Sequence, residues 1–460
     1  MKSAALLSAL AAATAVHATP TTTVKSKPRA TELEPITVTG NAFFKGKERF
    51  YVRGIDYQPG GASANIDPLA DPKVCKPDIE KFKTLGINVI RVYSTDNSKG
   101  HDECMNALGR RRHLCRARCQ QPAVLDQPRR PHPSYNAVYL QSVFATIDAF
   151  SKYSNTMAFF SGNEVIHDHK NTTLAAKYVK ATDRDMRAYI KARGYRKMLV
   201  GYSAADVTDN RMQTAAYFNC GSDEERSDFF AFNDYSWCSS DFITSGWNKK
   251  VEAFTGYGIP IFLSEYGCNT NTRNFGEMES LMHKNMTGVY SGGLMYEYTM
   301  EPNKYGIVEI KGGQDKGGVD QTGERKELPE FAAFASALKK FPAPTGDGGY
   351  SSTTKASECP PQDEHWAVET TALPAIPEGA KKYFTEGAGK GPGLKGSGSQ
   401  WAGDQASTSE GGSATGTSSG SSTASSSSAA IRSTVPALNN APLIVSGIVA
   451  LFTLVGAVAL

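Results

Sequence analysis

Two glutamates in this chain of 460 residues have the surroundings expected of a pair of carboxyl groups that cleaves a glycosidic bond. Glu164 follows the apolar run TMAFFSGN, and Glu265 lies in the segment IPIFLSEYG. Two carboxyl groups about 5 Å apart can cleave this bond with retention of the anomeric configuration. One attacks the anomeric carbon while the other protonates the leaving oxygen. The acid of the pair needs a raised pKa, from apolar walls or a neighbouring charge. A lone strand-end Glu is more commonly a solvated loop carboxylate, so the prediction depends on both lying together.

Alternating strand-like and helix-like segments supply the frame that would position these residues. We expect strands over 49–57, 88–94, 156–164, 197–204, 228–236, 259–267 and 291–299, and helices over 77–86, 102–108, 142–153 and 174–193. Such alternation predicts right-handed crossovers and a parallel sheet. Seven strands with a gap at the third position indicate an α/β fold of the (β/α)8 TIM-barrel type over residues 30–345.

Polar residues gather where these strands end, and in such a barrel the strand ends meet at one mouth. The clusters comprise Asp56 and Tyr57, Arg91 and Tyr93, Asn163 and Glu164, Asn233 with Asp234 and Tyr235, Glu265 and Tyr266, and Tyr296 with Glu297 and Tyr298. We expect Asn163 to hydrogen-bond the sugar 2-OH, a contact that strengthens in the transition state. The tyrosines offer faces for sugar stacking, with ordinary core packing as the alternative.

The two ends of the chain predict export and membrane attachment. Residues 1–18 combine Lys2, an apolar run and a small-residue site ending at Ala18, which is typical of a signal peptide; a buried helix is the alternative. The apolar segment 443–460 follows small residues and a polar spacer, so residues 435–460 are predicted to be a GPI-attachment propeptide, with a single-pass helix as the alternative.

The segment before that propeptide, residues 387–434, is rich in Gly, Ser, Thr and Ala and predicts a disordered, O-glycosylated stalk. N-x-S/T triplets at Asn171 and Asn285 are predicted N-glycosylation sites. The net charge of +4 is small for this length and indicates no nucleic-acid partner.

Eight cysteines in a secreted chain predict disulfides rather than a metal site. Six occur in ordinary surroundings, at Cys75, Cys104, Cys220, Cys238, Cys268 and Cys359. Cys115 and Cys119 lie in an arginine-rich stretch without a Cys-x-x-Cys pair or a histidine cluster, so we expect no metal and no cofactor.

Several motifs resemble glycoside hydrolase family 72, the fungal GPI-anchored 1,3-β-glucanosyltransferases of the cell wall. They are SGNEV, SEYGC, GIDYQPGG, NVIRVY, HDECMNAL and SGGLMYEY, spread over about residues 33–345. The resemblance implies that Glu164 is the acid/base and Glu265 the nucleophile. It implies donor-glucan contacts at Tyr93, Asn163, Asp206, Arg211 and Tyr296, and stacking at Tyr235 and Tyr305. It also implies the disulfides Cys75–Cys104, Cys220–Cys359 and Cys238–Cys268.

The activity implied by this resemblance is cleavage of an internal β-1,3 bond of cell-wall glucan and transfer of the new reducing end to another glucan chain. Because no cysteine follows Cys359, the chain is similar to the shorter subfamily without a C-terminal cysteine-rich module, and residues 346–386 would be a tail tied by Cys359. The implied location is the outer face of the membrane and the cell wall, through a GPI lipid. A secreted retaining β-1,3-glucanase and an inactive GPI-anchored glycan-binding relative are the alternatives.

The stretch LGRRRHLCRARCQQPAVLDQPRRP, residues 108–131, departs from the family pattern where a third strand is expected. Permitted codons for residues 109–131, read one base later, give DAAGIYVVLDVNNPQYSINRADP, which has the character of a buried strand and a polar loop. We therefore hypothesise that this segment is read out of frame; otherwise the barrel would lack a central strand, at a cost above a typical stability of about 5–15 kcal/mol. Sequencing the transcript tests this, because codons that cannot be reread in this way rule it out.

Overall fold

The computed structural model describes residues 33–109, 113–116, 134–238, 240–312, 320–369 and 372–397. The predicted signal peptide and GPI propeptide, and residues 110–112 and 117–133 of the arginine-rich stretch, lie outside these ranges. For residues 113–116 only the backbone is described.

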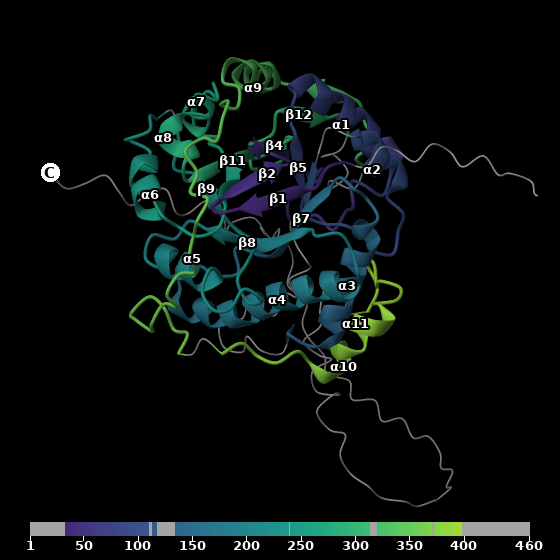
Figure 1. The fold of residues 1–460 in the computed structure, drawn as a ribbon. Helices are drawn as coiled ribbons and strands as arrows, with labels where there is room; N and C mark the ends of the chain where they lie inside the picture. The colour runs from purple at the N-terminus through teal and green to yellow at the C-terminus, as the bar shows by residue number, and fades with distance from the viewer. Residues whose placement is uncertain are drawn as a thin grey trace, which may run out of the picture. The chain divides into compact units, whose positions relative to one another are not determined.

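Eight parallel strands form a closed barrel at the centre of the fold (Figure 1). The barrel strands are β4 (Val52–Asp56), β5 (Val89–Val92), β6 (His113–Arg116), β7 (Thr156–Asn163), β8 (Leu199–Ala205), β9 (Phe229–Asp234), β10 (Ile261–Tyr266) and β11 (Tyr290–Met295). Neighbours in the chain are neighbours in the barrel, and β11 pairs with β4 to close it. The predicted α/β fold with a parallel sheet is confirmed, and all seven predicted strands are present.

The third barrel position, where the sequence leaves a gap, is occupied by β6. Its backbone pairs in parallel with β5 and with β7. The prediction that the barrel would lack its third strand is therefore wrong, because residues 113–116 form that strand. The hypothesis of a shifted reading frame over residues 109–131 stays a prediction.

Helices cover the outside of the barrel. They are α1 (Pro72–Leu85), α2 (Asp102–Leu108), α3 (Ala137–Ser151), the 3-10 helix η4 (Lys170–Ala175), α4 (Ala176–Ala192), α5 (Arg211–Phe218), α6 (Trp247–Phe254), α7 (Glu277–Leu281), α8 (Lys284–Thr287) and α9 (Pro329–Lys340). Helix α1 shows why such segments form where they do. Asp71 caps its first turn by accepting from Lys73 N, and Gly86 ends it in the left-handed conformation (φ 77°), which costs glycine little.

A small N-terminal sheet closes the end of the barrel opposite the strand C-termini. Its antiparallel strands are β1 (Ile36–Thr39), β2 (Ala42–Lys45) and β3 (Glu48–Phe50). Phe43 packs against Phe229 and Phe262 at the start of β9 and β10, with ring centroids 6.2 and 5.8 Å away. A further pair, β12 (Val308–Ile310) and β13 (Arg325–Glu327), follows the barrel.

Three disulfides link the covering elements: Cys75–Cys104, Cys220–Cys359 and Cys238–Cys268. These are the pairs that the family resemblance implies. The first joins α1 to α2, and the second ties the C-terminal tail to the end of α5.

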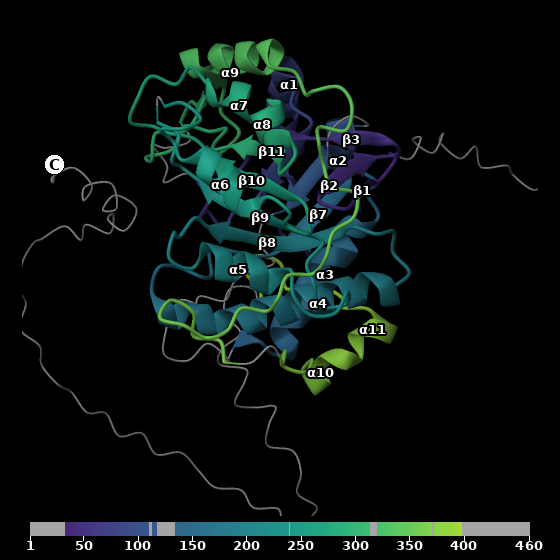
Figure 2. The ribbon, with the colours of Figure 1, turned by 60° about the vertical axis from the view of Figure 1, so that its left-hand side comes forward.

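The C-terminal tail continues to pack on the barrel beyond the predicted start of the stalk. Helices α10 (Glu378–Lys381) and α11 (Tyr383–Glu386) lie beside α3 and α4 in both views (Figures 1 and 2). Ala388 and Leu394 are buried. The boundary predicted at residue 387 is therefore too early, since the packed chain reaches at least Leu394.

Both predicted glycosylation sites lie at the surface, where a glycan could be attached. Asn171 in η4 and Asn285 in α8 are exposed. Their modification stays a prediction. Within the ranges that the structure describes, no helix is long and apolar enough to cross a membrane.

A buried carboxylate joins several elements at one side of the barrel. Asp78 of α1 is fully buried and accepts from Tyr57 (2.7 Å), from Tyr298 (2.8 Å), and from Nε and Nη2 of Arg325 (2.8 and 2.9 Å). A buried charge with this many donors is stable, but removing it leaves a buried guanidinium unpaired.

We expect Asp78→Ala to lower the free energy of unfolding by about 3–5 kcal/mol, because Arg325 loses its counter-ion. Denaturant unfolding measures this. Glu80→Ala on the same helix breaks only the exposed pair with Lys83 and should cost less than about 1 kcal/mol. Equal losses in the two variants would contradict the assignment.

Candidate active site

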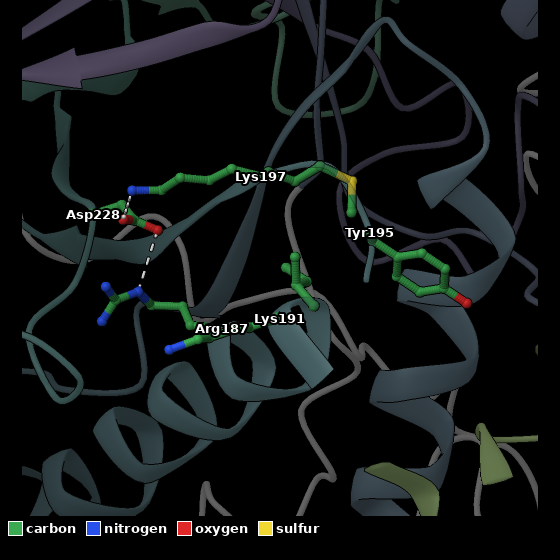
Figure 3. A pocket seen from close by; sticks show the side chains of 7 residues that line it. Arg187, Lys191, Tyr195, Lys197 and Asp228 are labelled. Carbon is green, nitrogen blue, oxygen red and sulfur yellow. Dashed lines mark ion pairs between the residues drawn. The ribbon is translucent and has the colours of Figure 1, made fainter. Parts of the chain in front are cut away.

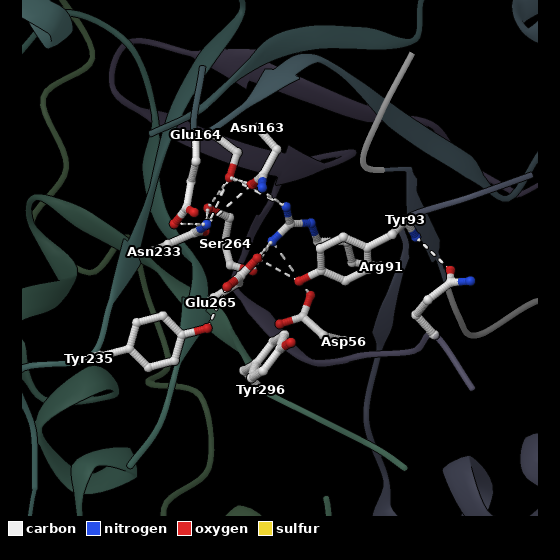
Figure 4. A network of polar contacts seen from close by, with 12 residues as sticks. Asp56, Arg91, Tyr93, Asn163, Glu164, Asn233, Tyr235, Ser264, Glu265 and Tyr296 are labelled. Carbon is white, nitrogen blue, oxygen red and sulfur yellow. Dashed lines mark hydrogen bonds and ion pairs between the residues drawn. The ribbon is translucent and has the colours of Figure 1, made fainter. Parts of the chain in front are cut away.

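The fold brings Glu164 and Glu265 to the same end of the barrel. Glu164 directly follows β7, the fourth barrel strand, and Glu265 lies near the end of β10, the seventh (Figure 4). Glu164 has a φ of 49°, which is unusual for a residue other than glycine, and its N–H donates to the Ser203 carbonyl (2.9 Å). Such strained backbone is concentrated at functional positions.

A fully buried arginine connects the two sides of this site. Arg91 of β5 donates through Nη1 to Glu265 Oε1 and to the Ser264 carbonyl, both at 2.8 Å, and through Nη2 to Asn163 Oδ1 at 2.6 Å. A buried guanidinium must be paired in this way to be tolerated. Arg91 therefore fixes the Glu265 carboxylate near the end of β10 relative to the Asn163 amide at the end of β7.

Glu265 also receives two phenolic hydroxyls. Tyr93 donates to Oε1 at 2.5 Å, and Tyr235 donates to Oε2. Hydrogen bonds to a charged acceptor are strong and favour its ionised form. With Arg91, they hold the Glu265 carboxyl group in one orientation.

Glu164 lies in the opposite electrostatic environment. Burial raises the pKa of Glu164 to about 7, and the charge of Glu265 adds to the increase. The Asn233 amide, which donates to Glu164 Oε1 at 2.8 Å, and the charge of Arg91 only partly oppose it. One glutamate therefore carries a proton up to about neutral pH while its neighbour is a carboxylate.

A network of amide and hydroxyl groups holds the side chain of Asn163 in place. Its Oδ1 accepts from Ser203 Oγ (2.7 Å) and Asn233 Nδ2 (3.1 Å), as well as from Arg91. Ser264 Oγ donates to Asn233 Oδ1 at 2.8 Å and fixes that amide in turn. Because the oxygen side of the Asn163 amide faces these donors, its NH2 side is turned away from them.

Two further carboxyl groups are buried at the same mouth. Asp56, at the end of β4, has Oδ1 3.7 Å from Arg91 Nη1. Burial raises the pKa of Asp56 well above its ordinary value although Arg91 opposes this. Burial likewise raises the pKa of Glu297 to about 8, against an opposing hydrogen bond from Asn303 Nδ2 (2.7 Å).

Three of the predicted sugar-binding tyrosines form an aromatic group beside Glu265. The ring centroids of Tyr235, Tyr296 and Tyr305 lie 5.3–5.9 Å apart, with edge-to-face geometry. The structure thus brings Tyr93, Asn163, Tyr235, Tyr296 and Tyr305 together with the two glutamates.

The other two predicted donor-binding residues lie in a different polar cluster. Arg211 contacts Asp206, and Lys250 Nζ lies 2.6 Å from Asp206 Oδ2 and 2.5 Å from Asp234 Oδ2. Their contact with glucan stays a prediction.

Six further residues build this site although no individual role was predicted for them: Asp56, Arg91, Ser203, Asn233, Ser264 and Glu297. The signal for Asp56, Arg91, Asn233 and Glu297 is their position at strand ends. Ser203 and Ser264 interrupt otherwise apolar strands, and that isolated polarity is their signal. Among the residues that the structure describes, no group of three or more His, Cys, Asp or Glu side chains could hold a metal ion.

A pocket of about 270 Å³ elsewhere on the barrel does not belong to this site (Figure 3). The pocket is lined by Lys197, just before β8, and by Asp228, just before β9. It therefore lies at the end of the barrel opposite the glutamates. Asp228 pairs there with Arg187 (3.4 Å) and Lys197 (3.1 Å). Positions at this end of a (β/α)8 barrel generally support stability.

Comparison with known proteins agrees with this geometry. Residues 25–330 match the model of glycoside hydrolase family 72, described as glucanosyltransferase. The chain belongs to this family. It is 58% identical over 391 residues to 1,3-beta-glucanosyltransferase gel1 of Aspergillus fumigatus, covering 85% of this chain and 84% of that protein. It is 47% identical over 361 residues to 1,3-beta-glucanosyltransferase GAS5 of Saccharomyces cerevisiae, covering 77% and 72%.

Solved structures of the family share the fold. A mutant of Saccharomyces cerevisiae Gas2p in complex with laminaritetraose and laminaripentaose superposes with a TM-score of 0.67 at 35% identity, covering 75% of each chain. ScGas2 in complex with a compound gives a TM-score of 0.67 at 36% identity, covering 75% of this chain and 77% of that one.

We expect Glu265→Gln to lower the pKa of Glu164 below about 7, because it removes the negative charge that opposes ionisation of Glu164. Titration of ¹³C-labelled glutamate carboxyl groups by NMR measures this, with the Glu164 signal assigned from Glu164→Gln. Glu80→Gln, at an exposed position of α1, should leave the pKa of Glu164 unchanged. A Glu164 pKa that does not respond to Glu265→Gln would refute the coupling.

Proposed function

We propose that this protein remodels cell-wall 1,3-β-glucan by retaining glycosyl transfer. It cleaves an internal β-1,3 bond and transfers the new reducing end to a second glucan chain, with no cofactor. The observation that supports this best is the contrast between Glu164, whose pKa is raised to about 7, and Glu265, which is held by one guanidinium and two phenols. The names of the related glucanosyltransferases supply the substrate class.

In the first step, Glu265 attacks the anomeric carbon while Glu164 gives its proton to the glycosidic oxygen. The bond from that oxygen to the anomeric carbon breaks, and a glycosyl ester forms on Glu265. The negative charge thereby moves from Glu265 to Glu164, so the buried site keeps its total charge. We infer that the NH2 group of Asn163 donates to the sugar 2-OH as the transition state forms.

In the second step, Glu164 acts as the base. It takes the proton of an acceptor hydroxyl, whose oxygen attacks the anomeric carbon and releases the Glu265 carboxylate. Transfer requires a sugar hydroxyl to reach the ester before water does. The aromatic group of Tyr235, Tyr296 and Tyr305 provides faces on which a glucan can stack and exclude water.

The proposed location is the outer face of the plasma membrane and the cell wall. The sequence features of residues 1–18, 387–434 and 435–460 support secretion and a GPI lipid. Phosphatidylinositol-specific phospholipase C should release the protein from intact cells, and protein retained after treatment would contradict a GPI anchor.

Incubation with a reduced laminari-oligosaccharide tests the activity. We expect products longer than the donor, because an acceptor hydroxyl intercepts the ester. Glu164→Gln should lower kcat by about 10²–10⁴-fold, and Glu265→Gln should abolish the reaction. Exclusively shorter products would show a β-1,3-glucanase, and no products from the wild type would support the inactive relative. A fully active Glu164→Gln or Glu265→Gln variant would overturn the assigned roles.

The pH dependence of kcat/KM provides a separate test. Because the pKa of Glu164 is about 7, the proton needed for cleavage is present below that pH and is lost as the pH rises through it. We therefore expect kcat/KM for oligosaccharide cleavage to fall above about pH 7. An activity that stays constant up to pH 9 would contradict this role.

A further inference from the structure

The segment of the tail that follows α11 runs along the barrel to the active-site face. Gln141 Nε2 of α3 donates to the carbonyls of Ala388 (2.7 Å) and Lys390 (3.0 Å). The Ala388 N–H donates to the Tyr189 hydroxyl of α4 at 3.0 Å. These contacts hold the start of the segment against two covering helices.

The end of the segment reaches the loops that follow β4 and β5, which belong to the catalytic end of the barrel. Asn65 Nδ2, in the first loop, donates to the Leu394 carbonyl at 3.0 Å. The Gly393 N–H donates to Asn97 Oδ1, in the second loop, at 2.8 Å. Leu394 is only 6% exposed, so this end is packed as well as hydrogen-bonded.

Glycine is required where the segment meets the second loop. A Cβ on Gly391 would lie 2.2 Å from Asn97 Oδ1, and one on Gly393 would lie 2.6 Å from Asp96 Oδ1. Asn97 cannot easily give way, because its amide nitrogen donates to the Ser142 carbonyl at 2.9 Å. The glycines that make this stretch look like a linker are therefore what allows it to dock.

The two loops are hydrogen-bonded to each other next to Tyr93. Gln58 Oε1 accepts from the N–H groups of Tyr93 (3.1 Å) and Ser94 (3.0 Å), and its amide nitrogen donates to the Ile66 carbonyl (2.8 Å). The Asp96 N–H donates to Asp67 of the first loop at 2.6 Å. Tyr93 begins the second loop and donates to Glu265, so the position of this loop sets a hydrogen bond to Glu265.

We propose that residues 388–394 are a strap that clamps the loops after β4 and β5 and thereby positions Tyr93 against Glu265 for glycosyl transfer. The strap acts through Tyr93, so its members are positioning residues. The proposal builds on the proposed function, but the contacts that it describes can be tested without activity.

Gly393→Ala and Gly389→Ala form a matched pair for this test. Both glycines have a φ of +67°, so both substitutions carry a similar backbone cost. A Cβ on Gly389 meets nothing within 4 Å, whereas one on Gly393 collides with Asp96. We expect Gly393→Ala to release the strap and Gly389→Ala to retain it.

Hydrogen exchange followed by mass spectrometry, on the full folded chain, provides the activity-independent measurement. Gly393→Ala should speed exchange in peptides covering 388–397 and 93–97, relative to Gly389→Ala. With laminari-oligosaccharide as substrate, kcat should fall by about 10–100-fold, as expected when a reacting group is misplaced, while the donor KM changes little. Because partial unfolding would also lower the apparent kcat at constant KM, kcat is expressed per folded enzyme, and a role in stability alone then leaves it unchanged.

The proposal is overturned if exchange rises in 388–397 but neither exchange at 93–97 nor kcat differs from Gly389→Ala. If Gly393→Ala does not fold, Leu394→Ala removes the buried anchor of the same segment and should give the same changes. If the wild type shows no glycosyl transfer, the proposed function fails, while the exchange at 93–97 still decides whether the strap holds this loop.

Discussion

One buried cation organises the active-site mouth. Arg91 is fully buried, yet four carboxyl groups gather around it or near it: Asp56, Glu164, Glu265 and Glu297. Ionising all four without water would cost far more than a single guanidinium can offset. Glu265 makes the short contact with Arg91 and receives two phenolic hydroxyls, so it is the carboxyl group with the most donors around it. The raised pKa values of the other three follow from the same constraint.

This unequal distribution of protons is what the chemistry requires. A retaining mechanism needs one carboxylate and one carboxylic acid at the same pH, on opposite sides of one bond. The barrel provides the two positions because its parallel strands end at a common mouth. Arg91, reaching across from β5, contacts Glu265 directly and only partly opposes the raised pKa of Glu164. The disulfides, the buried Asp78 cluster and the tail hold the surrounding elements in place.

The strand ends, and hence Glu164 and Glu265, could be predicted from the sequence because apolar runs of strand length are followed directly by polar residues. The role of Arg91 could not be predicted, because the sequence of a short strand does not show whether an arginine in it points into the barrel or out of it. The N-terminal sheet that places Phe43 under the barrel was also missed. The docked segment 388–394 was missed because its glycines give it the composition of a linker, and its fit depends on the positions of Asp96 and Asn97.

Neutron diffraction from a crystal exchanged into D2O at pH 6 tests this account most directly, because it locates the protons themselves. The account predicts deuterium on the carboxyl groups of Asp56, Glu164 and Glu297, with none on Glu265 and a fully deuterated guanidinium on Arg91. Deuterium on Glu265 together with an ionised Glu164 would contradict it.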